Sequence, residues 1–120
     1  MYAAGLAERV AQCEQAGLSR DKILVDPGFG FGKTVQQNMQ LLGRLDEFAK
    51  IGCPLLIGVS RKSSLGAITG QEVDDRLPAS LAAATAAVLK GASVVRAHDV
   101  AATVDAVTVA ARLLENSGAQ

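Results

Sequence analysis

The sequence predicts an α/β protein in which one helix is followed by three strand–helix units, an α(βα)3 order with parallel strands. Short β-branched runs alternate with helical patterns along the chain, and aromatic residues make up only 3% of it. Alternating strands and helices imply right-handed crossovers and a sheet that is covered on both faces. Because 49% of the 120 residues are apolar, the chain can bury one core.

The first helix and the first strand are predicted before residue 26. Leu6, Val10 and Cys13 recur at helical spacing, and Gly17 stands where a helix commonly ends in the left-handed conformation. The run 23–25 is short and β-branched and meets a turn-forming Asp-Pro-Gly sequence. This pattern is typical of a buried parallel strand.

Two further units repeat the pattern. Thr34 is a plausible N-cap for a helix whose apolar stripe runs from Val35 through Met39, Leu42 and Leu45 to Phe48. A second strand over 54–59 precedes the longest loop of the chain, and an Ala-rich helix follows over 77–90. A third strand over 93–96 leads into a helix with one apolar face: Val100, Val104, Val107, Ala111 and Leu114.

Three strands are too few to close a barrel, and no strand precedes the first helix. We therefore expect residues 1–120 to form one partial domain of a larger fold.

Composition excludes several function classes. Twelve basic residues balance twelve acidic ones, so no basic field would gather nucleic acid or an anionic membrane. No apolar stretch reaches the roughly 20 residues that span a bilayer, and the start lacks a signal pattern, which predicts a cytoplasmic location. Cys13 and Cys53 lie far apart and the chain has one His, so we expect packing thiols and no metal site in this chain.

Polar residues follow all three predicted strands at the point where each ends. Asp26 follows the first, the run 60–62 follows the second, and Arg96 and His98 lie at the third. In parallel α/β folds, ligands bind at this edge. Side chains alternate along a strand, so Arg96 and His98 share a face, and Gly58 makes space at the same level of the neighbouring strand.

Each of these residues has a structural alternative. Arg96 could form an ion pair with a nearby carboxylate, and His98 could cap the last helix. Asp99 is most simply the N-cap of that helix. Taken together, beside an Asp and a Lys from adjacent strands, Arg96 and His98 favour a pocket for an anionic ligand.

The glycine-rich loop 26–34 fails two general nucleotide-binding motifs. Pro27 stands where a Walker A loop needs glycine, and Lys33 stands where the dinucleotide fingerprint needs glycine. ATP and NAD are therefore not supported. The loop presents Phe29 and Phe31, which either pack beneath it or contact a flat heteroaromatic ligand.

Asp26 and Lys62 suggest what such a ligand would be. A carboxylate accepts hydrogen bonds from ring N–H and amino groups, while an ammonium donates to a carbonyl and a ring nitrogen. Those are the complementary edges of a pterin.

Three motifs resemble the C-terminal part of the dihydropteroate synthase family: residues 26–33 (DPGFGFGK), 58–63 (GVSRKS) and 96–100 (RAHDV). They stand at strand ends in the family's order, and the match covers almost the whole chain. The resemblance implies the last three strands of a (β/α)8 TIM barrel. Related methyltetrahydrofolate-binding methyltransferases share the barrel and a carboxylate that binds the pterin, but they are not expected to contain all three motifs together.

The resemblance also implies a transferase of folate biosynthesis. It would join 4-aminobenzoate to 6-hydroxymethyl-7,8-dihydropterin pyrophosphate, giving 7,8-dihydropteroate and pyrophosphate, with Mg²⁺ assisting and sulfonamides competing with the aminobenzoate. By position, Lys62, Arg96 and His98 would be catalytic, and Arg96 and His98 would bind the pyrophosphate. The pterin would contact Asp26, Phe29, Gly58, Lys62 and Arg96; the 4-aminobenzoate would contact Gly30, Phe31, Ser60 and Arg61; Lys33 would support the pocket.

The family's metal-binding Asn, its two mobile loops and its further pterin-binding Asp and Asn residues have no counterpart in this sequence. We therefore expect a C-terminal fragment that is inactive alone, with the Mg²⁺ ligand in the missing part. The alternatives are a non-catalytic folded fragment or assembly module, a related pterin-binding methyltransferase-type barrel, and a phosphate-handling barrel of other chemistry, which would be indifferent to Asp26→Ala. A homodimer through outer helices is also expected, because Ala82, Ala83, Ala86 and Ala87 exceed what one sheet-facing stripe requires.

Overall fold

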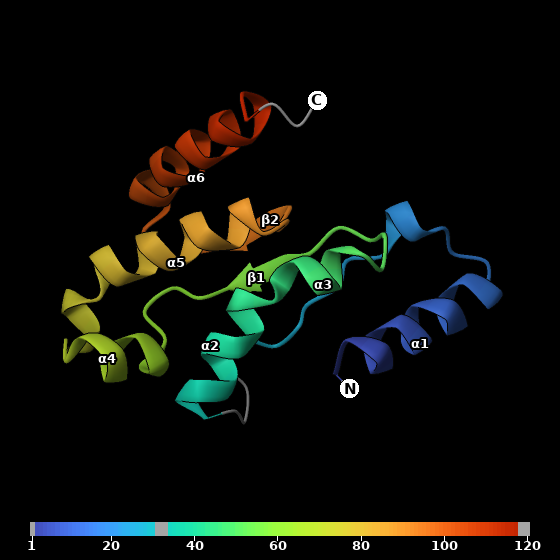
Figure 1. Ribbon diagram of the computed structural model, residues 1–120, viewed down its shortest axis with the longest axis horizontal. Coiled ribbons are helices and arrows are strands. Elements are labelled where there is room, and N and C mark those ends of the chain that lie inside the picture. The colour runs from blue at the N-terminus through green and yellow to red at the C-terminus, as the bar shows by residue number, and fades with distance from the viewer. Residues whose placement is uncertain (1, 31–33, 118–120) are drawn as a thin grey trace.

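A small parallel sheet lies at the centre of the computed structural model, which describes residues 2–30 and 34–117. Its strands are β1, Leu56–Gly58, and β2, Val94–Arg96, and they pair in parallel with Gly58 opposite Arg96 (Figure 1). A single parallel bridge joins Val25 to Leu55. Since Val25 and β2 bond to alternate backbone groups of the central segment, they lie on opposite sides of it. The predicted parallel α/β arrangement is confirmed.

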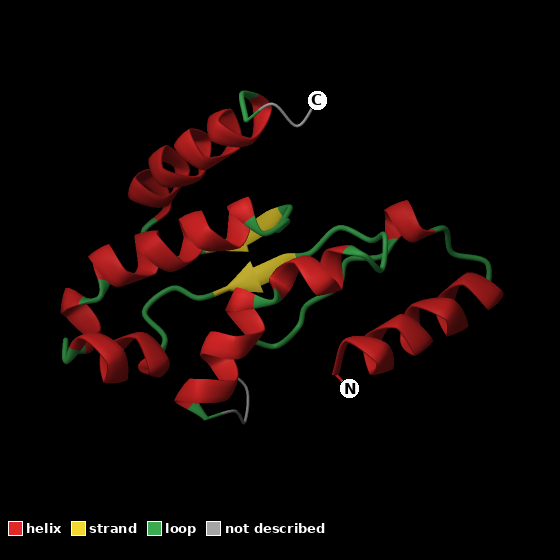
Figure 2. Cartoon of the chain, viewed as in Figure 1, coloured by secondary structure: helices red, strands yellow, loops and turns green. Residues whose placement is uncertain are grey.

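Helices surround this sheet (Figure 2). They are α1 (Tyr2–Gln15), α2 (Val35–Gly43), α3 (Leu45–Ala49), α4 (Ser63–Thr69), α5 (Leu77–Leu89) and α6 (Val100–Glu115). Two short 3-10 turns cover Arg20–Lys22 and Val73–Asp75. No helix within the described ranges is long and apolar enough to cross a membrane.

The helix ends largely follow the sequence signals. Gly17 and Gly91 follow α1 and α5 with φ values of 106° and 111°, the left-handed region that glycine adopts without strain. Thr34 caps α2, because its hydroxyl accepts from the Gln37 amide and the Gln37 side chain accepts from the Thr34 amide. This reciprocal pair is a capping box, and it fixes where α2 begins.

Three sequence expectations are corrected. The helix predicted from Val35 to Phe48 breaks at Arg44, where φ −111° and ψ 23° leave the helical region directly after Gly43. The break turns Leu45 inward, while Val35 stays exposed. The strand predicted over 23–25 is reduced to the bridge at Val25, because Val25 alone in this segment exchanges backbone hydrogen bonds with the 54–56 backbone.

The long loop between the second strand and the Ala-rich helix holds an unpredicted helix, α4. Its seven residues make two turns, too few to show a helical period, and Gly70 ends it at φ 76°. As a result, Lys62 lies at the N-cap position of a helix instead of in an open loop.

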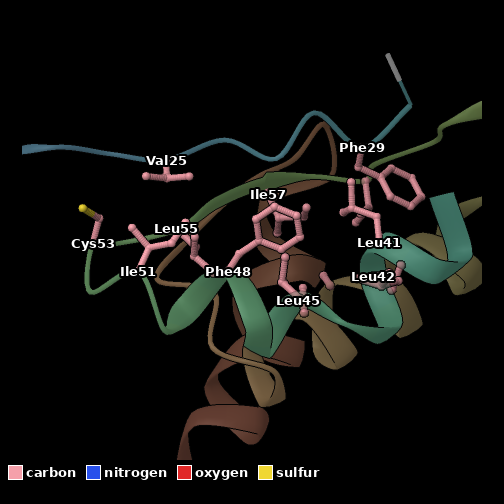
Figure 3. Close-up of a cluster of buried hydrophobic side chains, with 14 of the residues drawn as sticks. Val25, Phe29, Leu41, Leu42, Leu45, Phe48, Ile51, Cys53, Leu55 and Ile57 are labelled. Carbon is pink, nitrogen blue, oxygen red and sulfur yellow. The ribbon is translucent and has the colours of Figure 1, made fainter. Parts of the chain in front are cut away.

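The hydrophobic core gathers around β1 and the segment before it. Leu55 and Ile57 are completely buried, and α2 and α3 add Leu41, Leu42, Leu45 and Phe48 (Figure 3). Phe29 reaches into the same cluster from the glycine-rich loop and is only 1% exposed. This burial anchors the loop that carries Asp26.

The far side of β2 is open. The apolar face predicted for the last helix exists, but it lines a groove of about 430 Å³ together with Val88 and Val95. Val94 of β2 and Val100, Val104 and Leu114 of α6 are all exposed by more than two fifths. The sheet is thus covered on the α2–α3 side and open beyond β2.

Candidate functional site

The guanidinium of Arg96 lies flat against Gly58. A Cβ atom added to Gly58 would come within 2.4 Å of Arg96 Nη2 and 2.8 Å of Cζ, so any larger residue would displace this side chain. Gly58 and Arg96 are register partners in β1 and β2, as the alternation along the strands predicts. With 53% of its side chain exposed, Arg96 keeps a face available to a ligand.

Asp26 lies beside Arg96 and is held by its own loop. Its Oδ1 accepts a hydrogen bond of 2.8 Å from the Gly28 amide, while Oδ2 lies 4.0 Å from Arg96 Nη1. The ion pair considered as a structural alternative for Arg96 therefore exists. It is long and one third of the Asp26 side chain is exposed, so both groups can still receive a ligand.

Ser60 and His98 form a second pair across the strand ends. The Ser60 hydroxyl accepts from the His98 amide at 3.1 Å and lies 3.0 Å from Nδ1 of the imidazole. Ser60 is buried whereas His98 is exposed, so the hydroxyl orients the ring and leaves Nε2 on the side away from this contact. The imidazole of His98 thus contacts Ser60, which does not support the alternative that His98 caps the last helix.

Arg61 occupies an unusual backbone conformation with φ 54°. Its amide donates to Ser80 Oγ at 2.8 Å, and its carbonyl accepts from Arg76 Nη1 at 3.1 Å. Arg76 in turn lies across Gly66, where an added Cβ would come within 2.5 Å of its Nε. These contacts from α4 and α5 hold a turn that most residues with a side chain avoid.

The Arg61 side chain binds Asp99 in a two-pronged ion pair. Nε donates to Oδ2 at 3.1 Å and Nη2 donates to Oδ1 at 2.6 Å. The hydrogen bonds from Arg61 hold the pKa of Asp99 below its usual range, and the same contact raises the pKa of Arg61. Asp99 stands at the N-cap position of α6, as predicted, but its carboxylate makes no cap hydrogen bond because Arg61 occupies it.

Lys62 and Gly30 lie together at the same edge. Gly30 has φ 86°, and a Cβ placed on it would lie 3.1 Å from Cδ of Lys62 and 3.5 Å from Nζ. The lysine stem thus runs along the backbone of the glycine-rich loop. Phe29 is expected from the sequence to contact the pterin, but its ring is buried in the core. Phe31 and Lys33 lie outside the described residues.

Asn38 in α2 and Ser64 in α4 were not predicted from the sequence, and both are buried behind the glycine-rich loop. Asn38 Oδ1 accepts from the Gly30 amide at 2.8 Å, and its Nδ2 donates to Ser64 Oγ at 2.7 Å. The Thr34–Gln37 capping box was the available signal, because it sets the register that turns the next residue inward. Ser80 and Arg76 were missed because their partners are backbone atoms distant in sequence.

Within 2–30 and 34–117, no three side chains of His, Cys, Asp or Glu gather closely enough to hold an ion. The described residues therefore do not by themselves fit a Mg²⁺ site. Cys53 is buried in the core as a packing residue, and Cys13 is partly exposed on α1.

The site gathers cationic and polar groups at the carboxyl ends of parallel strands, with the Asp26 carboxylate beside Arg96 and the Asp99 carboxylate bound to Arg61. Such an edge can hold an anionic group through guanidinium and imidazole, and a ring through the acceptors of a carboxylate. Fold and site together define an α/β protein with a candidate ligand site at the carboxyl ends of its parallel strands.

The family model for the pterin binding enzymes matches residues 2–98. The chain belongs to the pterin-binding enzyme family.

Named relatives agree with this placement. Dihydropteroate synthase of Escherichia coli K12 is 49% identical over 102 residues, which are 85% of this chain and 36% of the relative. The enzyme of Neisseria meningitidis serogroup C is 52% identical over 103 residues, with 84% and 36% covered. The chain thus spans little more than a third of the length of these curated relatives.

Solved structures match the fold closely. A dihydropteroate synthase from Coxiella burnetii in complex with pteroic acid has a TM-score of 0.90 at 43% identity, covering 95% of this chain and 42% of that one. The Xanthomonas albilineans enzyme in complex with 7,8-dihydropteroate has a TM-score of 0.88 at 44% identity, covering 96% and 44%. The predicted fold class, the C-terminal portion of a (β/α)8 TIM barrel, is confirmed.

Proposed function

We propose that this chain is the C-terminal part of a dihydropteroate synthase and carries much of its pterin and pyrophosphate site. The observation that carries the proposal is the exposed Arg96 guanidinium seated on Gly58 beside the Asp26 carboxylate. Lys62 lies along Gly30 at the same edge. Because the chain spans 36% of the curated relatives, turnover would need the rest of the barrel.

The proposed pterin contacts follow from the donor and acceptor chemistry of these groups. Asp26 Oδ2 would accept from the ring N–H and amino group, since Gly28 already occupies Oδ1. The Lys62 ammonium would donate to the ring carbonyl and a ring nitrogen. Arg96 would lie against the ring with its exposed face and reach the pyrophosphate.

The proposed chemistry is stabilisation of a leaving group. The bond between the pterin methylene carbon and the pyrophosphate oxygen breaks with its electron pair going to pyrophosphate, and Arg96 and His98 stabilise the charge that develops. The amine nitrogen of 4-aminobenzoate forms the new bond to carbon and loses a proton. No nucleophilic side chain of the protein takes part in these steps.

The 4-aminobenzoate is assigned to Gly30, Phe31, Ser60 and Arg61. The Ser60 hydroxyl is engaged with His98, so Ser60 would contribute by positioning the imidazole. The Arg61 guanidinium would contact the 4-aminobenzoate from the position in which Asp99 holds it. Structures of the Xanthomonas albilineans enzyme support this assignment, since one contains 4-aminobenzoic acid, a substrate of the proposed reaction, and another contains 7,8-dihydropteroate, its product.

The groove beyond β2 supports the fragment part of the proposal. Its lining residues on α6, among them Val104 and Leu114, are apolar and exposed. A further strand and helix of the barrel would bury this face and pair the outer edge of β2. The domain assigned to residues 1–120 would then be partial.

We further propose a homodimer, Mg²⁺ dependence with ligands outside this chain, competition by sulfonamides and a cytoplasmic location. Ala83 and Ala87 are buried within this chain, so close helix packing accounts for that half of the alanine set. Support for association comes instead from Val109 and Leu113, one turn apart on α6 and exposed by 60% and 54%.

Calorimetric titration of this chain with 6-hydroxymethyl-7,8-dihydropterin pyrophosphate, in the presence of Mg²⁺, tests the pterin site. We expect saturable binding that Asp26→Ala weakens by about tenfold or more, because hydrogen bonds to a charged group are each worth about 1.5–3 kcal/mol. Asp105→Ala, which removes an exposed carboxylate from α6, is the matched control and should not change the affinity.

Two outcomes would redirect the proposal. Binding that survives Asp26→Ala would favour a phosphate-handling barrel of other chemistry, since only pterin recognition needs that carboxylate. A folded chain without binding would be a non-catalytic fragment.

A further inference from the structure

Asn38 is an amide in a place where an apolar residue would be expected. It lies in the first turn of α2, is 1% exposed, and has both ends of its side chain engaged. Asparagine is a weak helix former, and a buried amide is costly unless its donors and acceptors are satisfied. Helix formation and core packing therefore do not explain Asn38, whereas its two hydrogen bonds do.

Those two hydrogen bonds reach opposite walls of one site. Oδ1 holds the Gly30 amide in the glycine-rich loop, and Nδ2 holds Ser64, two residues beyond Lys62 in the first turn of α4. Gly30 and the Lys62 stem are themselves in contact. The Asn38 amide group consequently links the two segments on which Gly30 and Lys62 lie, and it sets the spacing between the Gly30 backbone and the Lys62 side chain.

We propose that Asn38 is a positioning residue for pterin binding, acting through Gly30 on one side and through Ser64 and Lys62 on the other. The inference rests on the proposed function. It adds that Lys62 binds the ring effectively only while Asn38 and Ser64 hold α4 against the glycine-rich loop. Asn38 itself is too deeply buried to touch the ligand.

The test uses the same titration together with amide hydrogen exchange at Gly30. Asn38→Ala should weaken binding of the dihydropterin pyrophosphate about tenfold, and Ser64→Ala about threefold, as expected for the loss of two bonds and one bond. Both variants should accelerate exchange at Gly30. Because the two residues act through one network, Asn38→Ala/Ser64→Ala should bind like Asn38→Ala alone.

Ser80→Ala is the matched control. Ser80 is 4% exposed and Ser64 is 5% exposed, and each serine joins a helix to the 60–64 region, but Ser80 holds the Arg61 amide and does not join the Asn38 network. Its removal should leave amide exchange at Gly30 within about twofold of the original. Should Asn38→Ala fail to fold, the contrast between Ser64→Ala and Ser80→Ala decides the question.

The outcomes separate this inference from the proposed function. If the original chain binds no pterin, the proposed function and this role fail together. If it binds pterin and Ser64→Ala leaves binding unchanged, only the positioning role is overturned. Additive losses in the double variant, or equal loosening of Gly30 by Ser80→Ala, would also overturn it.

Discussion

The two sides of the central sheet differ in how completely this chain covers them. Around β1, Leu55 and Ile57 are fully buried beneath α2 and α3, whereas Val95 of β2 and Val104 of α6 line an open groove. The enclosed side holds the Asn38 network that sets Gly30 and Lys62. The open side carries Arg96 and His98, so two of the proposed ligand-binding groups lie in the less covered part of the fold.

The largest difference between the sides should appear in stability. Ile57→Ala removes a completely buried side chain and should lower the free energy of unfolding by about 3 kcal/mol, through lost burial and the cavity left behind. Val104→Ala removes atoms from an exposed face and should change it by less than about 0.5 kcal/mol. Urea unfolding followed by circular dichroism measures both.

If Ile57→Ala does not fold, Ile57→Val takes its place in the comparison, and it should lower the free energy of unfolding by about 1 kcal/mol. A Val104→Ala effect as large as that of Ile57→Ala would show that the groove is closed in solution, and the contrast between the sides would break down.

Gly58→Ala should separate binding from stability. The added methyl collides with the guanidinium of Arg96, which is the far end of a flexible and exposed side chain and can move away. We expect a small loss of stability, whereas the affinity for the dihydropterin pyrophosphate should fall by about tenfold or more. Titration calorimetry measures the affinity, and unchanged binding would remove Arg96 from the site.

The smallest effect is expected at the Arg61–Asp99 pair, which joins α6 to the end of β1. Its hydrogen bonds lower the pKa of Asp99 in the folded chain, so its contribution is present above the unfolded-state value of about 3.9 and is lost as the pH falls through the lower folded value. Asp99→Asn should therefore have a lower Tm than the original at pH 7.

The difference in Tm should shrink below about pH 4 as the original loses its advantage. Thermal melts at several pH values measure it. A constant difference over the whole range would mean that the pair contributes through shape and not through charge.

The parallel α/β order was predictable because its signals are local. β-branched runs and the glycines at 17 and 91 each act within a few residues. The break at Arg44 and the helix α4 were not predictable in this way. Both depend on which side chains the sheet can bury, and neither Leu45 nor Leu65 reveals that from its neighbours in sequence.

The candidate site divides along the same line. Alternation along the strands placed Arg96 over Gly58 and His98 beside Ser60, because parallel register repeats regularly. The Asn38–Ser64 hydrogen bond joins residues 26 positions apart, and the Arg61–Asp99 pair joins residues 38 apart. Such contacts depend on how helices pack, which no sequence period encodes, and the pairing of Asp99 with Arg61 could not be predicted for that reason.

The left-handed backbone of Arg61 has a consequence for how this chain tolerates mutation. A non-glycine residue in that conformation costs about 1–2 kcal/mol, which glycine would not incur. Arg61→Gly would relieve the strain while removing the guanidinium that Asp99 holds. Selection for stability alone would therefore act on two opposing effects at this position, the strained backbone and the ion pair with Asp99.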